Sequence, residues 1–293
     1  MTWHQITVTT NKETASEAAD LFSELGAVAV TFADAEDRPV YEPPPGETVI
    51  WDRTQVLALF EMDIEPESVQ PVLIEQFGGL LENWRVEIVE DQVWERAWME
   101  HYQPMLFADR LWVCPTGQEI HEPGKACLVL DPGLAFGTGT HATTALCLEW
   151  LASQNLTGQK IIDYGCGSGI LGIAGLLLGA RDVLAVDIDE QALTATLDNA
   201  RKNGVTEQIQ VFFPDQLPNI KSDMVLANIL AQPLCDLAET IVAPLKHGGA
   251  LILSGILREQ AEQVMTAYRA QGIKFTEPVF QEDWCRLDGR MQG

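Results

Sequence analysis

Basic residues are scarce in this chain of 293 residues. Lysine and arginine together number 18, against 43 aspartates and glutamates, so the formal net charge is −25 at pH 7. A protein of this charge repels nucleic acids and anionic membranes and attracts basic partners. The composition therefore argues against direct binding of nucleic acid, although acidic surfaces are also common among cytosolic proteins of many functions.

Signatures of several other protein classes are absent. The six cysteines form no Cys-x-x-Cys pair, and no cluster of cysteine and histidine has the spacing of a zinc site. We therefore expect reduced thiols and no bound metal. The most apolar stretch, residues 170–180, is too short to span a membrane, and the chain opens without the basic and apolar regions of a signal peptide. These features predict a cytoplasmic protein without membrane association.

The first 90 residues predict a small α+β domain. Alternation of apolar and polar residues indicates strands, and helical periodicity indicates helices. The predicted elements are strands near 6–10, 27–32, 55–61 and 84–89 and helices near 12–25 and 65–77. Their order is that of a ferredoxin-like domain, a fold that serves many functions and does not by itself indicate chemistry. Residues 91–104 then predict a connecting helix.

From about residue 105 onward, short apolar runs alternate with helical stretches. This pattern predicts a parallel sheet that helices cover on both faces. The runs lie at 160–164, 183–187, 209–213, 224–228 and 250–254, and the helices near 168–179, 190–203, 232–243 and 256–271. Residues 275–280 and 284–287 predict a closing antiparallel hairpin. We therefore expect two domains, at 1–90 and 105–293, joined by the helix at 91–104.

The strongest candidate for a ligand site is a glycine-rich turn after the first of these runs. The sequence IIDYGCGSGILG at 161–172 places Gly165, Gly167 and Gly169 where glycine lets the backbone approach a ligand without a Cβ clash. Its second half also fits G-x-G-x-x-G, so a dinucleotide is an alternative ligand. Asp163 argues against that alternative, because its carboxylate would repel a pyrophosphate and attract a cationic amine.

A second acidic residue supports a nucleoside ligand. Asp187 ends the next predicted strand, where it is suitably placed to accept hydrogen bonds from both ribose hydroxyls. An acidic residue occurs at this place both in dinucleotide sites and in sites for other adenosine compounds. Asp187 therefore supports an adenosine nucleoside without choosing between them.

Two further segments are weaker candidates. Residues 131–144, DPGLAFGTGTHATT, offer three glycines and four threonines for contacts with a ligand, and Thr140 could cap the helix that begins near His141. His141 could act as a base, although a single histidine more often has a structural role. Asn228 ends a later strand at the same sheet edge as Asp163 and Asp187. Its carbonyl could orient the lone pair of an amine, or the side chain could cap a loop or helix.

In this order, the motifs resemble those of class I S-adenosylmethionine-dependent methyltransferases and, more narrowly, the bacterial ribosomal protein L11 methyltransferase family. The resemblance covers the whole chain and rests on DPGLAFGTGTHATT, IIDYGCGSGILGIA, AVDIDEQAL, ANILAQPL and LSGIL. It implies a Rossmann-like seven-stranded methyltransferase domain behind the ferredoxin-like domain. One departure is Ala142, where the family usually has proline; it could loosen the start of the helix.

The resemblance also implies site residues. It places Phe136, Thr144, Gly165, Asp187 and Asn228 at the cofactor S-adenosylmethionine, and it makes Asn228 the catalytic residue that contacts the incoming amine. Together with the glycine-rich turn and its acid, the expected cofactor-binding set is Phe136, Thr144, Asp163, Gly165, Gly167, Gly169, Asp187 and Asn228. No strong base is evident near Asn228, so we expect the amine to lose its proton to water.

The implied substrate is a basic protein of the large ribosomal subunit, methylated on lysine ε-amines and on its N-terminal α-amine. The front domain would recognise it, and the charge agrees: residues 1–90 hold 4 basic and 18 acidic residues, a net charge of −14 within the total of −25. We expect a monomer. Two alternatives remain open, a methyltransferase for another protein or a small amine, and a non-catalytic nucleoside-binding assembly factor.

Overall fold

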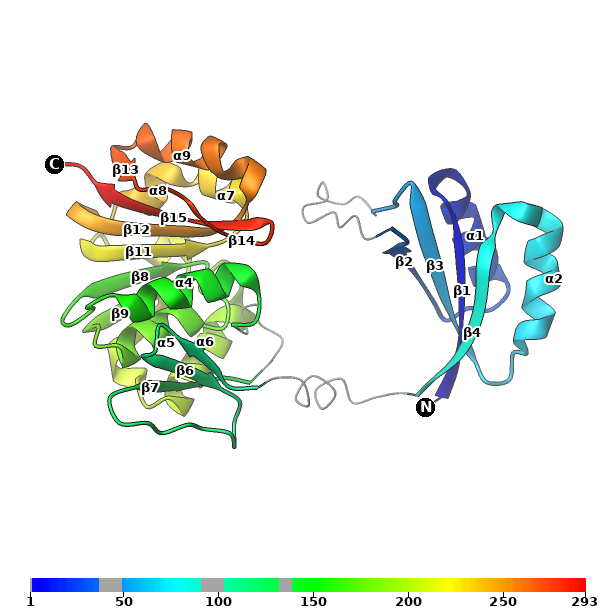
Figure 1. Ribbon diagram of the computed structural model, residues 1–293, viewed down its shortest axis with the longest axis horizontal. Coiled ribbons are helices and arrows are strands. Elements are labelled where there is room, and N and C mark those ends of the chain that lie inside the picture. Colours follow the sequence, from blue (N-terminus) through cyan, green and yellow to red (C-terminus); the bar gives the residue numbers. More distant parts are fainter. Residues whose placement is uncertain (1, 37–48, 91–102, 132–138) are drawn as a thin grey trace. The chain divides into compact units, whose positions relative to one another are not determined.

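A computed structural model describes residues 2–36, 49–90, 103–131 and 139–293 (Figure 1). The chain divides into two compact units, Met1–Val93 and Trp94–Gly293. The first unit contains one cluster of buried apolar side chains and the second contains two. The connecting helix predicted at 91–104 falls largely on residues 91–102, which lie outside the described residues.

The first unit is a four-stranded antiparallel sheet with two helices. Its elements are β1 (Thr2–Asn11), α1 (Lys12–Glu24), β2 (Ala29–Asp34), β3 (Arg53–Glu61), α2 (Pro66–Phe77), the short 3₁₀ helix η1 (Gly78–Leu80) and β4 (Glu82–Glu90). The strands lie in the order β2-β3-β1-β4. This is the ferredoxin-like arrangement that the sequence predicts, and both central strands, β1 and β3, lie between two neighbours.

Alternation along the strands builds the core of this unit. In β3 every second residue from Thr54 to Phe60 is buried, and in β1 Ile6 and Val8 are buried. Their apolar side chains pack with α1 and α2 on one face of the sheet, as the two-residue period of a strand requires. The fully buried apolar residues of these strands are Ile6, Val8, Val56, Ala58 and Phe60. Helix α1 begins where Asn11 caps it, with Oδ1 accepting the backbone N–H of Thr14 at 2.9 Å.

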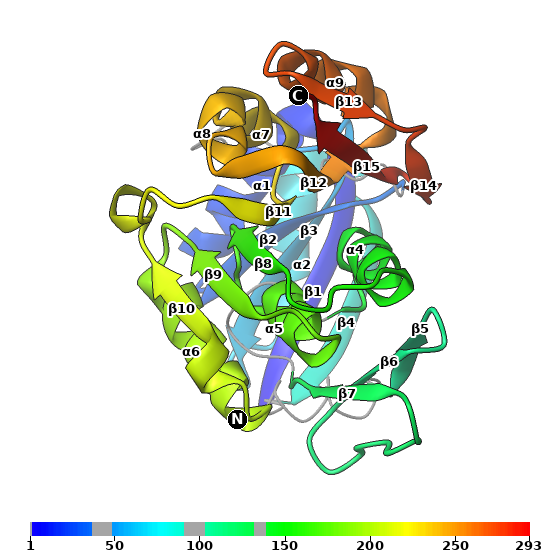
Figure 2. The same ribbon diagram turned by 90° about the vertical axis from the view of Figure 1, so that its left-hand side faces the viewer.

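The second unit contains the predicted mixed sheet (Figure 2). Seven strands follow the order β10-β9-β8-β11-β12-β15-β13, and an eighth, β14, pairs with β15. The strands are β8 (Lys160–Tyr164), β9 (Asp182–Val186), β10 (Ile209–Phe212), β11 (Ser222–Asn228), β12 (Leu245–Leu257), β13 (Ile273–Phe275), β14 (Val279–Gln281) and β15 (Trp284–Met291). Strands β8 to β12 run parallel, and β15 is antiparallel to β12. The expected Rossmann-like sheet of seven strands is confirmed, with β14 as an additional short strand.

Helices cover both faces of this sheet. They are α4 (Ala142–Ser153), α5 (Ile170–Leu177), α6 (Glu190–Lys202), α7 (Ala231–Asp236), α8 (Ala238–Val242) and α9 (Ala261–Arg269). Successive residues of β8 belong to different apolar clusters. Ile161 packs with α4, α5 and α6, and Ile162 packs with α7, α8 and α9. Among the described residues, no helix is long and apolar enough to cross a membrane.

Three predicted element boundaries were wrong. The helix expected at 232–243 is two helices, because Leu237 between them has φ −98° and ψ 9°, outside the helical region. The helix expected from 256 begins at Ala261, because β12 continues to Leu257, which pairs with Trp284 of β15. The strand expected at 275–280 is divided into β13 and β14, with Pro278 between them lacking the N–H that a continuous ladder needs.

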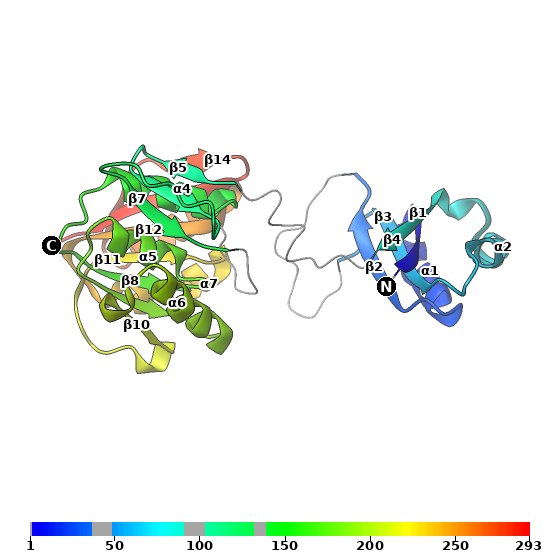
Figure 3. The same cartoon turned by 90° about the horizontal axis from the view of Figure 1, so that it is seen from below.

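A small sheet precedes the large one, and the sequence analysis did not predict it. It consists of β5 (Met105–Phe107), β6 (Leu111–Cys114) and β7 (Ala126–Val129), with β5 antiparallel and β7 parallel to β6. Its buried side chains join those of α4 and α5 in one cluster, and β5 and β7 lie near these helices in Figure 3. All six cysteines of the chain are free thiols.

Candidate functional site

The glycine-rich turn follows β8, in the middle of the large sheet. Strand order reverses beside β8, and ligands of such sheets bind at the carboxyl ends of the strands near this reversal. Gly165, Gly167 and Gly169 have φ of +75°, +53° and +77°, the left-handed region that favours glycine. A Cβ on Gly165 would also collide with Cγ2 of Ile229. The turn therefore requires glycine both for its backbone angles and for space.

Neighbouring elements hold the turn by hydrogen bonds. The backbone N–H groups of Gly165 and Cys166 both donate to the carbonyl of Val186 at the end of β9, at 2.7 and 3.0 Å. From α6, the Thr196 hydroxyl donates to the carbonyl of Gly167 at 3.1 Å. The turn is thus fixed to β9 and α6 before any ligand arrives.

Asp187 lies directly after β9 and faces this turn. Its Oδ2 accepts the N–H of Gly167 at 2.9 Å, and its Oδ1 accepts the N–H of Asp189 at 3.0 Å. Each carboxylate oxygen has two lone pairs, so each retains an acceptor site for a ribose hydroxyl. The structure therefore brings Asp187 and the glycine-rich turn together, as the sequence analysis expected.

The sequence analysis missed the residue after Asp187. Ile188 is a large apolar side chain that is 83% exposed, although it follows a buried strand. An apolar side chain held in water at this edge offers a surface for the flat ring of a nucleoside base. The signal in the sequence was a single isoleucine between two aspartates, which resembles any scattered surface residue.

Asp163 lies within β8, beneath the turn. Its side chain is only 1% exposed, and Oδ2 accepts the N–H of Gly172 in α5 at 2.8 Å. Burial raises the pKa of this carboxyl to about 7; the bond from Gly172 opposes the rise, and the charge of Asp187 adds to it. Asp163 is therefore a buried acid that titrates near neutral pH. Its expected contact with a cofactor amine stays a prediction.

Asn228 and Thr144 meet at the same sheet edge from segments far apart in the sequence. Asn228 ends β11 and Thr144 is fully buried in the first turn of α4; Nδ2 of Asn228 donates to the Thr144 hydroxyl at 3.2 Å. This bond turns the amide's carbonyl oxygen away from Thr144, which suits it to accept a hydrogen bond from an amine. Helix α7 begins after Leu230 without a side-chain cap, so Asn228 does not cap that helix.

His141 has a structural role in the described part of the chain. It is the N-cap of α4, with Nδ1 near the N–H and hydroxyl of Thr143 at 3.4 and 2.8 Å. The cap is therefore His141 itself and not Thr140. The His141 ring contacts Trp284 edge-to-face, with ring centroids 5.0 Å apart. Burial lowers the pKa of His141, against the opposing charge of Glu282, so the ring is neutral at pH 7.

Phe136 lies in residues 132–138, outside the described residues, and its contact with the cofactor stays a prediction. Within the residues that the structure describes, no group of three or more His, Cys, Asp or Glu side chains has the arrangement of a metal site. The arrangement around β8, β9 and β11 is instead two carboxylates, a glycine-rich backbone, an exposed apolar side chain and an oriented amide.

Comparison with known proteins gives a consistent relationship. The family model "Ribosomal protein L11 methyltransferase (PrmA)" matches residues 2–292. Proteins named ribosomal protein L11 methyltransferase are 50% identical over 288 residues in Methylococcus capsulatus, covering 98% of each chain, and 48% identical over 297 residues in Vibrio parahaemolyticus, covering all of each chain. A crystal structure of ribosomal protein L11 methylase from Lactobacillus delbrueckii subsp. bulgaricus matches with a TM-score of 0.59 and 29% identity, covering 66% of this chain and 99% of that one. The chain therefore belongs to the ribosomal protein L11 methyltransferase family.

Proposed function

We propose that this protein transfers methyl groups from S-adenosylmethionine to amines of ribosomal protein L11. Membership of the family gives the reaction and the substrate class. The observation that carries the proposal is the hydrogen bond between Asn228 and Thr144, which presents an amide carbonyl at the sheet edge where Asp187 and the glycine-rich turn also lie.

The residues at this edge fit the proposed cofactor. S-adenosylmethionine supplies a methyl group on a positively charged sulfur. Asp187 would accept its ribose hydroxyls, Ile188 would cover its adenine, and the glycine-rich turn would lie against its methionine part. Asp163 contributes negative charge beneath that turn, and Phe136 and Thr144 complete the proposed contacts. These groups suit a cationic nucleoside better than a pyrophosphate, because two carboxylates adjoin the turn.

The chemistry requires position and a neutral amine. Methyl transfer is an in-line displacement, so holding the two reactants in contact supplies much of the acceleration. The carbonyl oxygen of Asn228 would accept an N–H of the substrate amine and aim its lone pair at the methyl group. Partial burial of a lysine ammonium lowers its pKa, which allows the proton to leave to water.

The substrate's charge suits the first unit. We propose that residues 1–90, with a net charge of −14, bind the ribosomal protein and present its lysine ε-amines and N-terminal α-amine to residues 105–293. In this proposal the protein acts as a cytoplasmic monomer, without direct contact to nucleic acid, which its overall charge would repel.

The proposal can be tested with a mixture of ribosomal proteins. We expect the purified protein and S-adenosylmethionine with a labelled methyl group to label L11 in preference to every other ribosomal protein. Labelling of a different protein or only of small amines would support the alternative acceptor. Tight cofactor binding without any labelling would support a nucleoside-binding assembly factor instead.

Asp187→Ala should weaken binding of S-adenosylmethionine about 10- to 100-fold, because charge-assisted hydrogen bonds contribute about 1.5–3 kcal/mol. Isothermal titration calorimetry measures this directly. The matched control is Asp198→Ala, which removes a carboxylate within α6 that forms an exposed ion pair with Arg201. Unchanged affinity in Asp187→Ala, or tight binding of a nicotinamide dinucleotide to the unmodified protein, would contradict the assignment.

Affinity for S-adenosylmethionine should rise between pH 5.5 and 7.5. Below a pKa of about 7 the Asp163 carboxyl is protonated, and above it the ionised form attracts the cationic cofactor. The expected slope is up to about tenfold per pH unit well below that pKa. Asp163→Asn should flatten the profile, and the cofactor's own titration is common to both proteins. If the affinities of the two proteins change with pH in parallel, the charge of Asp163 does not affect cofactor binding.

The raised pKa of Asp163 also predicts how the stability of the folded protein changes with pH. Because the pKa of Asp163 is raised from 3.8 to about 7 in the folded protein, its contribution to stability is fully present below pH 3.8 and is lost as the pH rises through about 7. Thermal unfolding without cofactor should therefore show Asp163→Asn gaining stability relative to the unmodified protein as the pH increases from 5 to 8. A constant difference across this range would contradict the raised pKa.

A further inference from the structure

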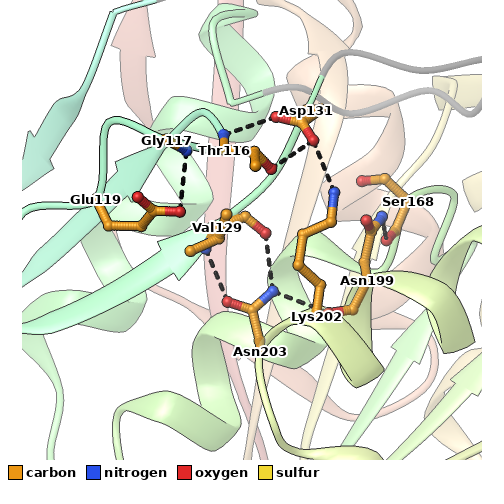
Figure 4. A network of polar contacts seen from close by, with 9 residues as sticks. All are labelled: Thr116, Gly117, Glu119, Val129, Asp131, Ser168, Asn199, Lys202 and Asn203. Atoms are coloured by element: carbon orange, nitrogen blue, oxygen red, sulfur yellow. Dashed lines mark hydrogen bonds and ion pairs between the residues drawn. The ribbon is translucent and has the colours of Figure 1, made fainter.

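The last turn of α6 carries polar side chains that reach two separate segments (Figure 4). Helix α6 begins at its N-cap Asp189, two residues after Asp187, and ends at Lys202. Asn199, Lys202 and the following Asn203 all make hydrogen bonds to residues 31 to 74 positions away in the sequence. Polar residues at a helix end are usually exposed to solvent, so this set of long-range contacts calls for a physical explanation.

Asn203 takes the place of a neighbouring strand. Its Oδ1 accepts the backbone N–H of Val129 at 2.7 Å, and its Nδ2 donates to the carbonyl of the same residue at 2.8 Å. Val129 ends β7, which is the edge strand of the sheet β5-β6-β7 and would otherwise leave these groups unpaired. Nδ2 also donates to the carbonyl of Asn199 at 2.9 Å, which fixes the amide. The end of β7 is therefore bound to the end of α6.

Lys202 binds Asp131, two residues beyond Val129 in the chain. Its Nζ lies 2.8 Å from Oδ2 of Asp131, and the two side chains are only 35% and 32% exposed. Thr116 donates both its N–H and its hydroxyl to the same carboxylate, at 2.7 and 2.6 Å. Burial alone would raise the pKa of Asp131, but the bonds from Lys202 and Thr116 outweigh it and lower the pKa. The carboxylate is thus ionised and held by three hydrogen bonds.

The same helix holds the glycine-rich turn. Nδ2 of Asn199 donates to the carbonyl of Ser168 at 2.9 Å, one helical turn from Asn203. Figure 4 shows Ser168 and Asp131 on the same side of α6, with Asn199 and Lys202 reaching toward them. One helix end therefore connects the glycine-rich turn to the end of β7 and to Asp131.

We propose that Lys202 and Asn203 are positioning residues for binding of S-adenosylmethionine. They bind the end of α6 to Asp131 and Val129, so that α6, which holds the glycine-rich turn through Asn199, is fixed in place before the cofactor binds. Such preorganisation lowers the ordering cost of binding. The inference rests on the proposed function. In it, Lys202 does not contact the reacting atoms.

Replacing Lys202 by methionine tests this. We expect Lys202→Met to raise the Kd and the KM for S-adenosylmethionine about tenfold, as loss of a charged hydrogen bond would, and to leave kcat at saturating cofactor within about twofold. Lys202→Arg should restore most of the affinity, because arginine reaches the same carboxylate. The matched control is Arg201→Met, which removes a cation from the same helix turn whose ion pair with Asp198 is exposed.

A second variant distinguishes the proposed positioning role from a loss of folding. Asp131→Asn should weaken cofactor binding at least as much as Lys202→Met, and the double variant should be no worse than Asp131→Asn alone, because both substitutions remove the ion pair between Lys202 and Asp131. If Lys202→Met and Asp131→Asn lower only the unfolding temperature and leave the cofactor Kd unchanged, the cluster is merely structural and the inference is wrong. If the unmodified protein itself does not bind S-adenosylmethionine, the proposed function fails instead.

Discussion

Replacing Asn228 by alanine should lower the kcat for methylation of L11 about 100-fold, the cost of misplacing a reacting group by roughly an ångström. The variant should fold normally, because Asn228 lies at the end of β11 and its side chain donates a hydrogen bond to Thr144. Its Kd for S-adenosylmethionine should change far less than its kcat, because the amide acts mainly when the amine and the methyl group approach each other. Steady-state kinetics with saturating cofactor, alongside calorimetry, separates the two effects.

The orienting partner of Asn228 supplies the matched controls. Thr144→Ser keeps the hydroxyl that accepts the Asn228 amide and should retain nearly full activity. Thr144→Val removes the hydroxyl at the same volume and should lose activity about tenfold, a smaller loss than that of Asn228→Ala. Full methylation activity in a well-folded Asn228→Ala variant would mean that the amide only completes the local hydrogen bonding, and the proposed mechanism would be wrong.

Removing the first unit separates cofactor binding from substrate recognition. A protein that begins at residue 94 should bind S-adenosylmethionine with the affinity of the full chain, because each unit has its own buried core and the described site residues all belong to the second unit. Its kcat/KM for L11 should fall at least about 100-fold, because the acidic unit that attracts the basic protein is gone.

The salt dependence of L11 binding tests the same prediction in a second way. Screening acts over about 10 Å at 0.1 M salt, so the affinity of the full protein for L11 should decrease as salt is added, and the truncated protein should show a weaker dependence. Both forms should methylate a short lysine peptide at similar rates. If the folded truncated protein methylates L11 as fast as the full chain does, the first unit is not a substrate-recognition module.

The architecture followed from the sequence because its signals are local. Short buried strands and glycines that end helices recur in both units. The left-handed backbone angles of Gly165, Gly167 and Gly169 explain why glycine marks the turn after β8. Asp187 and Asn228 could be assigned to one sheet edge because the carboxyl ends of parallel strands meet there. The expectation needed only the parallel direction of the strands, which the alternation of strands and helices indicates.

What the sequence could not predict depends on contacts between distant residues. The bond from Asn228 to Thr144 spans 84 positions, and the pair from Lys202 to Asp131 spans 71. Lys202 and Asn203 resemble an ordinary solvated helix end, and the small sheet beside them consists of strands of four residues or fewer with little periodicity. The end of β12 was misplaced for the same reason, since pairing with β15 extends it.

The most direct test of the account is to map the methyl groups on L11 by mass spectrometry after incubation with the full protein and S-adenosylmethionine. The account predicts methylation of lysine ε-amines and of the N-terminal α-amine, and strongly reduced methylation with Asn228→Ala under the same conditions. Unmodified amines on L11 after incubation with cofactor-binding, folded protein, or methyl groups on side chains other than amines, would contradict it.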